Sequence, residues 1–195
     1  MVDAGPALGL IELSTIARGV VVADALVKRA EVTLVASRPV SGGKHLVIFG
    51  GEVDVVEEAM GAGMAAAGGA PVLVDRLLVT HLFAPLWKLV AAADGHHPDA
   101  WTSGPVGAVA IVETTTVCAA VEAADAAGKA APVALRDMRL GMGIGGKAFF
   151  SMTGSLSDVE AAVEAARVGA RPERLVQLEV IAHPAAELVG RLIFG

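Results

Sequence analysis

One glycine-rich segment, residues 141–147, has the residue types of a loop that binds phosphate. Its letters GMGIGGK match GxGxxG and GxxxxGK, patterns in which glycines lead from a strand into a helix whose N–H groups hold the anion. Here the residues after Lys147 read AFFSM, which predicts a strand. Ala148 also stands where a phosphate-binding loop needs a hydroxyl for Mg²⁺. We therefore interpret the segment as a tight turn and not as a nucleotide site.

Histidine and cysteine offer few candidates for metal or thiol chemistry. His96 and His97, followed by Pro98 and Asp99, could place two imidazoles and a carboxylate around a metal, but adjacent side chains seldom converge, so we interpret them as a solvated linker. Cys118 lies near a predicted helix start, where a thiol pKa can fall. Its neighbours are small and apolar, which favours a buried packing residue.

Two glutamates, Glu12 and Glu113, each end a predicted strand. Paired carboxylates could perform general acid–base catalysis. An internal repeat relates these two, however, and explains the pair without catalysis. His81 and His183 also recur at matched points, which we interpret as structural. No Ser/His/Asp or Cys/His set recurs at an informative spacing, so the residues predict no catalytic site, no metal site and no cofactor.

The chain contains the same sequence pattern twice. Residues 7–38 align with 108–139 without a gap, and 12 of these 32 positions are identical. After a two-residue insertion, 42–60 align with 145–163 with 7 of 19 positions identical. A shared order of strand, helix, loop and second helix makes chance similarity of two Ala-rich helices a poor explanation. We therefore infer a tandem duplication.

Hydrophobic periodicity and turn residues predict the elements that position these side chains. In the first copy, helix 17–30 would bury Val20, Ala23, Val27 and Ala30. The first copy has predicted strands at 8–13, 32–36, 45–49 and 73–81 and helices at 17–30, 52–66 and 85–90. The second copy has predicted strands near 107–113, 132–139, 147–153 and 177–183 and helices near 116–130 and 156–167.

These elements predict an α+β protein of two domains, each a small antiparallel sheet with helices on one face. We expect the first domain at 1–91, a linker at 92–105 and the second domain at 106–195. The linker contains the sequences DGHHP and SGP, which are rich in turn-forming residues.

Composition excludes several classes of protein. The chain has 195 residues, 54% of them hydrophobic, a mean hydropathy of +0.63 and a net charge of −6. Charges interrupt every long apolar stretch, so we expect no membrane span. The acidic balance argues against nucleic-acid binding. A single cysteine fits a reducing cytoplasm, and the N-terminal residues have no basic region typical of a signal peptide.

A strand ending in Glu, a helix with Ala-Asp-Ala-x-x-Lys-x-Ala, a Val-x-Leu segment and a Gly-Gly hairpin occur in both copies. This pattern, over about 7–90 and 106–194, resembles the shell proteins of bacterial microcompartments. Two such domains in one chain resemble the tandem-domain class. The resemblance implies the ferredoxin-like shell domain, a trimer that imitates the family's hexamer, and a location in a microcompartment shell in the bacterial cytoplasm. It implies a structural protein and not an enzyme.

The resemblance also implies roles for particular residues. Helical lysines lie at the tile edge in the family, which here means Lys28 and Lys129. The implied partners are further copies of this chain and other hexameric and pentameric shell proteins. The hairpin between the second and third strands lines a central pore for small polar metabolites, and here the pore-lining residues would be Ser41, Gly42, Gly43, Gly141, Met142, Gly143, Ile144 and Gly145.

Ser41 stands where some tandem members have the cysteine that holds an iron–sulfur cluster, so we predict no cluster. Our hypothesis is a narrow opening ringed by three Ser41 hydroxyls and backbone N–H groups. Two alternatives stay open. One is a trimeric small-molecule sensor or regulatory module. The other is an enzyme with diverged halves, for which Arg136 and Asp137 are candidates, although we interpret both as an exposed strand end.

Overall fold

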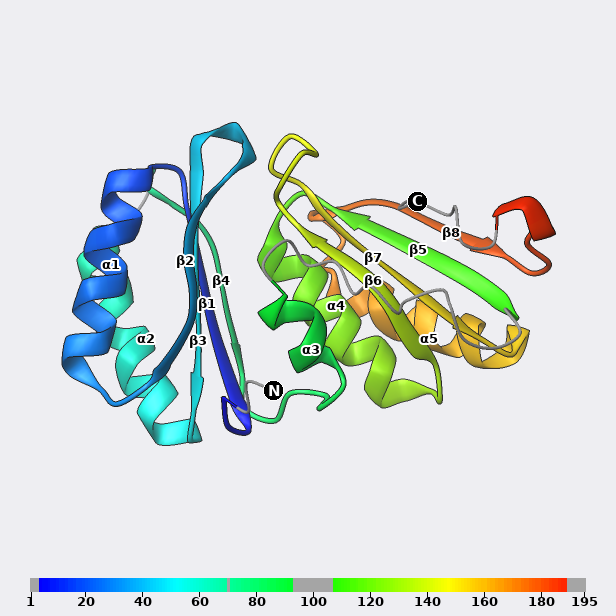
Figure 1. The fold of residues 1–195 in the computed structure, drawn as a ribbon, viewed down its shortest axis with the longest axis horizontal. Helices are drawn as coiled ribbons and strands as arrows, with labels where there is room; N and C mark the ends of the chain where they lie inside the picture. The colour runs from blue at the N-terminus through cyan, green and yellow to red at the C-terminus, as the bar shows by residue number, and fades with distance from the viewer. Residues whose placement is uncertain (1–3, 70, 93–106, 189–195) are drawn as a thin grey trace.

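The computed structural model describes residues 4–69, 71–92 and 107–188. They form two α+β units that lie beside each other, with the short helix α3 (Leu86–Ala91) between them (Figure 1). The first unit consists of β1 (Ala7–Leu13), α1 (Ile16–Arg29), β2 (Thr33–Val40), β3 (Lys44–Gly51), α2 (Val53–Ala67) and β4 (Leu73–Val79). The second consists of β5 (Ala108–Thr114), α4 (Val117–Ala130), β6 (Ala134–Leu140), β7 (Ala148–Gly154), α5 (Leu156–Gly169) and β8 (Leu175–Ile181).

Each unit contains one four-stranded antiparallel sheet. The strand order is β2-β3-β1-β4 in the first and β6-β7-β5-β8 in the second. The registers correspond as well, because Glu12 pairs with Leu46 and Asp75 while Glu113 pairs with Phe149 and Gln177. The predicted α+β duplication is therefore confirmed. Strands β2 and β3 are longer than predicted because they continue as one hairpin to a short turn at Ser41–Gly43.

Strand β1 is buried along its whole length because both faces of the first sheet are covered. On one face, Ile11 and Leu13 pack with α1 and α2. On the other face, Leu8 and Leu10 belong to a core that continues into α3 and α4 of the second unit. Figure 1 shows these two coverings on opposite sides of the sheet. This arrangement explains why β1 is an apolar run and not an alternating one.

The predicted buried face of α1 is only partly right. Ala23 is buried and Ala30 is half-buried, but Val20 and Val27 are 56% and 41% exposed, and Val22 and Leu26 are buried in their place. Helix α1 is apolar on two faces, and close packing decides between them. A Cβ on the buried Gly19 would lie 2.2 Å from the ring of His45, so only glycine lets this face meet β3.

Segment 141–146 is a turn that leads into strand β7 and not into a helix, as predicted. Glycines 141, 143, 145 and 146 all have φ between +66° and +82°, which side chains rarely adopt. The described part of the chain contains no helix that is long and apolar enough to cross a membrane. Most of the predicted linker 92–105, including His96 and His97, lies outside the described residues.

Candidate functional sites at the domain interface

The loops that carry the predicted pore residues lie side by side. The Ser41 N–H donates to the carbonyl of Gly141 at 3.0 Å, and the Gly143 N–H donates to the Ser41 hydroxyl at 2.9 Å. The Ser41 hydroxyl is therefore already bonded within the chain. The predicted set divides into buried Gly141, half-buried Ser41 and Ile144, and exposed Gly42, Gly43, Met142, Gly143 and Gly145.

The same ion pair anchors both hairpins. Lys44 Nζ lies 2.8 Å from Glu12 Oε1, and Lys147 Nζ lies 2.8 Å from Glu113 Oε1. Lys44 also donates to the carbonyl of Gly146 at 2.9 Å, which ties the second loop to the first sheet. The repeated glutamates thus have repeated partners. The matched lysines after Gly-Gly were the sequence signal that could have shown this.

Glu12 joins the two units, whereas Glu113 does not. The Oε2 atom of Glu12 accepts a hydrogen bond from the N–H of Val117, the first residue of α4, at 2.8 Å. Burial raises the pKa of Glu12, and this effect is opposed by Lys44 and by the bond from Val117. The Glu12 side chain is fully buried, while that of Glu113 is 36% exposed.

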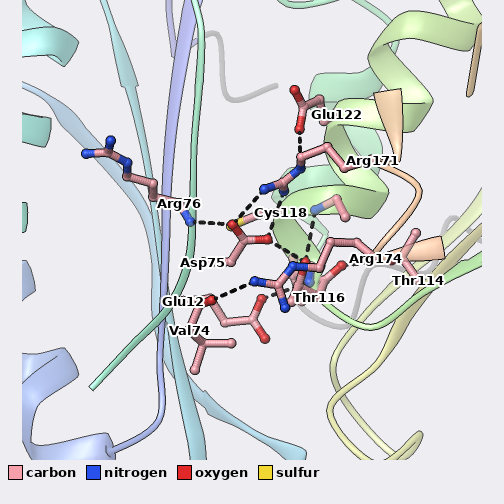
Figure 2. A network of polar contacts seen from close by, with 12 residues as sticks. Glu12, Val74, Asp75, Arg76, Thr114, Thr116, Cys118, Glu122, Arg171 and Arg174 are labelled. Atoms are coloured by element: carbon pink, nitrogen blue, oxygen red, sulfur yellow. Dashed lines mark hydrogen bonds and ion pairs between the residues drawn. The ribbon is translucent and has the colours of Figure 1, made fainter. Parts of the chain in front are cut away.

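A second polar network, centred on Asp75, crosses the interface (Figure 2). Arg171 donates to both carboxylate oxygens at 3.0 and 2.8 Å, and the Thr116 hydroxyl donates to Oδ2 at 2.6 Å. Burial by itself raises the pKa of Asp75. The bonds from Arg171 and Thr116 outweigh it and hold the pKa below its usual value. This carboxylate is therefore ionised and fully engaged.

Arg171 has an unusual backbone conformation for its residue type. Its φ is +58°, in the left-handed region, and its counterpart in the first unit is Gly69 at φ +80°. The correspondence is set by hydrogen bonds, since the carbonyl of Arg171 accepts from Arg174 and Leu175 as that of Gly69 does from Val72 and Leu73. An arginine there costs about 1 kcal/mol of backbone strain. Its ion pairs with Asp75 and with Glu122 (3.1 Å) compensate for this strain.

The apolar part of the interface lies around α4. Val117, Cys118 and Val121 are fully buried. The Cys118 sulfur lies 4.0 Å from the carbonyl of Leu10, and burial raises the pKa of this thiol well above its usual value, so it is the packing residue that we predicted. No group of three or more His, Cys, Asp or Glu side chains in the described ranges could hold a metal.

The end of α4 fits closely against the chain after β4. Gly128 faces Phe83, whose ring would lie 2.4 Å from a Cβ at this position. The Phe83 N–H donates to Asp125 Oδ1 at 2.7 Å. The small residue at 128 is therefore required by the aromatic ring that covers it.

The two predicted edge lysines occupy matching positions. Lys28 pairs with Asp24 at 2.7 Å and Lys129 pairs with Asp125 at 2.6 Å, both one helical turn apart. Both ammonium groups are partly or largely exposed to solvent.

The interpretation of Arg136 and Asp137 as an exposed strand end is wrong, because Asp137 is only 1% exposed and Arg136 is half-buried. His81 and His183 are both exposed, and the Nδ1 atom of His81 lies 3.4 Å from the Thr80 hydroxyl.

Comparison with known proteins decides between the open interpretations. The family model described as the BMC domain matches residues 7–82 and again 108–184. The chain belongs to the BMC domain family. A relative in Citrobacter freundii, the bacterial microcompartment shell protein PduT, is 34% identical over 190 residues, which cover 97% of this chain and 98% of that protein.

Other relatives agree with this BMC assignment. The carboxysome shell protein CsoS1A of Hydrogenovibrio crunogenus is 38% identical over 84 residues, which cover 43% of this chain and 84% of that protein. A solved microcompartment protein structure from Desulfitobacterium hafniense is 34% identical, covers 95% of this chain and 98% of that one, and has a TM-score of 0.79.

The chain is thus a tandem BMC-domain shell protein, which confirms the predicted family and fold and a structural, non-enzymatic role. The sensor and enzyme alternatives are set aside. An iron–sulfur cluster requires cysteine thiolates. The paired BMC loops contain none, and the single cysteine of the chain is buried in α4, so these residues do not fit a cluster.

Proposed function

We propose that three copies of this chain close into a ring of six BMC domains, which forms one tile in the shell of a microcompartment in the bacterial cytoplasm. One observation carries the proposal. The residues that α4 buries against the first unit have counterparts on α1, and these counterparts are exposed. Ile16, Val20 and Val27 are 45%, 56% and 41% exposed, while their counterparts Val117, Val121 and Gly128 are buried.

The second sheet offers the matching acceptor surface. Ile111 and Glu113, which correspond to Leu10 and Glu12, are only half-buried. In the ring, α1 of a second copy packs on β5 and β8 as α4 packs on β1 and β4. Glu113 then accepts the N–H of Ile16 from that copy, as Glu12 accepts the N–H of Val117. Such a head-to-tail contact closes into a ring when the rotation allows, and six similar domains require three chains.

Size-exclusion chromatography with multi-angle light scattering, run on the purified chain at micromolar concentration, tests the ring. We expect a particle of three times 19.6 kDa. Val20→Asp places a charge in the interchain interface and should give folded monomers. Val168→Asp is the matched control, because Val168 is a 77% exposed helical valine outside this interface, and it should leave the trimer unchanged. A wild-type monomer at micromolar concentration would overturn the proposal.

The paired loops line the central opening of this tile, through which small polar metabolites pass. Support comes from the contacts that bring 41–43 and 141–146 together, and from their glycines and exposed backbone. Ser41→Phe should slow metabolite flux across intact shells, with Ser157→Phe, an exposed serine on α5, as the control. Unchanged flux in Ser41→Phe would sink the assignment.

Lys28 and Lys129 lie at the edges where tiles meet each other and meet other hexameric and pentameric shell proteins. Both are solvent-accessible cations at matching positions in the two domains. Lys28→Glu with Lys129→Glu should leave trimers intact and abolish sheets in electron micrographs. Lys88→Glu, on the exposed side of α3, should assemble normally. Normal sheets from the double variant would refute the edge role.

A further inference from the structure

We propose that the two kinds of interface in the ring differ in residue size and charge so that only one order of domains is possible. The inference rests on the proposed trimer and goes beyond it. It states that the first sheet accepts only the second domain's helices, and that the second sheet accepts only α1 of another copy of this same chain.

The correspondence after the fourth strand is set by a repeated turn. The Leu86 N–H donates to the carbonyl of Phe83 at 2.8 Å, and the Leu188 N–H donates to that of Ala185 at 2.9 Å. Phe83 and Ala185 therefore occupy matching places. The ungapped repeat makes Gly128 the counterpart of Val27.

Residue size is reversed between the two interfaces. Inside the chain, the large Phe83 covers the small Gly128. Between chains, the small Ala185 would cover the larger Val27. The alternative pairing of first sheet with α1 puts Phe83 against Val27, where a Cβ would lie 2.4 Å from the ring in the geometry seen at Gly128. Overpacking of this kind is destabilising, and the pairing of Ala185 with Gly128 would leave a void.

The charges at the two interfaces also differ, and they favour the same order of domains as the residue sizes do. The first sheet presents buried Asp75, which Arg171 of the second domain neutralises. Their counterparts are Gln177, which pairs with Glu113 in the sheet as Asp75 pairs with Glu12, and Gly69. If α1 and the turn at Gly69 packed on the first sheet, Asp75 would be buried without its cation. An unpaired buried charge is strongly unfavourable, so this pairing is rejected.

Two independent features thus favour the same domain order. The first sheet accepts a domain whose first helix has a glycine near its end, as α4 has Gly128. That domain must also have an arginine in the turn after its second helix, as Arg171 follows α5. Domain two of this chain supplies both, and domain one supplies neither. The ring therefore alternates first and second domains, and the partner that fits its open edge is a second copy of this chain.

A double-mutant cycle on trimer dissociation tests the size rule. Ala185→Phe should clash with Val27 of the neighbouring copy and raise the midpoint concentration for dissociation at least about tenfold. Ala185→Phe with Val27→Gly recreates the intrachain pair and should recover most of this loss. Ala161→Phe, at an exposed alanine on α5, is the control and should have no effect.

A second cycle tests the charge rule where the aromatic substitution disturbs folding. Gln177→Asp should weaken the trimer, because it adds a carboxylate near Glu113 and Glu179. Gly69→Arg should restore it, since Gly69 has the backbone of Arg171 and open space for a Cβ. Independent, additive effects in both cycles would overturn the inference while leaving the trimer standing. A monomeric wild type would instead overturn the proposed function.

Discussion

The two domains share one fold, yet their first helices lie in opposite environments. In the second domain, α4 is buried against the sheet of the first. In the first domain, α1 presents the corresponding side chains to solvent. Ile16 and Val20 are similar in type to their counterparts Val117 and Val121, so their difference in exposure lies in the surroundings. It shows that a duplicated domain can use one copy of an interface within the chain and keep the other for assembly.

We expect the largest difference between the two helices at their matched valines, Val121 on α4 and Val20 on α1. Val121→Asp buries a charge in the intrachain interface and should lower the free energy of unfolding by more than about 4 kcal/mol. Val20→Asp, at the exposed counterpart, should change the stability of the monomer by less than about 0.5 kcal/mol. Urea denaturation followed by circular dichroism measures both, at a protein concentration below the dissociation midpoint of the trimer, so that the wild-type reference is also monomeric. Equal losses would mean that the two helices are not in different environments.

The matched turns after α2 and α5 give the next largest effect. Arg171→Gly makes the second turn identical in type to the first at Gly69. It relieves about 1 kcal/mol of backbone strain but leaves Asp75 buried without its cation, and we expect a net loss of about 3 kcal/mol. Arg167→Ala, which removes a long surface ion pair of 3.9 Å, should lose less than about 0.5 kcal/mol. A gain in stability for Arg171→Gly would contradict the role of the Asp75 network.

The matched lysines of the two hairpins, Lys44 and Lys147, should show a smaller difference in stability. Lys44→Met leaves the fully buried Glu12 carboxylate without its ammonium partner, and it should lower the free energy of unfolding by about 2 kcal/mol. Lys147→Met should lose less than about 1 kcal/mol, because its pair with Glu113 is half-exposed. Both are measured by urea denaturation in the monomeric Val20→Asp background. Equal losses there would show that Glu12 and Glu113 are equally exposed in the monomer.

Much of the fold was predictable because the repeat constrains it. The two copies independently predict the same order of strands, helices and turns, and both sheets have the predicted antiparallel form. The buried face of α1 was not predictable from its periodicity. That helix is apolar on two faces, and its contact with its own sheet is decided by Gly19 against His45.

The Asp75 network could not be predicted from the sequence, for a physical reason. Asp75 and Arg171 lie 96 positions apart, and neither is repeated, since Gln177 and Gly69 stand at their counterparts. The repeat in the sequence indicates only the residues that both domains share. The contacts that distinguish them depend on how one domain packs on the other. The burial of Asp137 was not predictable either, because the residue pattern of a strand does not show what covers its face.

Interchain disulfide trapping tests the central claim, that α1 of one copy packs on the second sheet of the next. Cys118 lies near Leu10 inside the chain, so their counterparts Ala17 and Ile111 should meet between chains. In a Cys118→Ala background, Ala17→Cys with Ile111→Cys should give covalent dimers and trimers on oxidation and nothing larger, whereas either cysteine alone should give neither. A double variant that stays monomeric, or a ladder that continues beyond three chains, would contradict the closed ring.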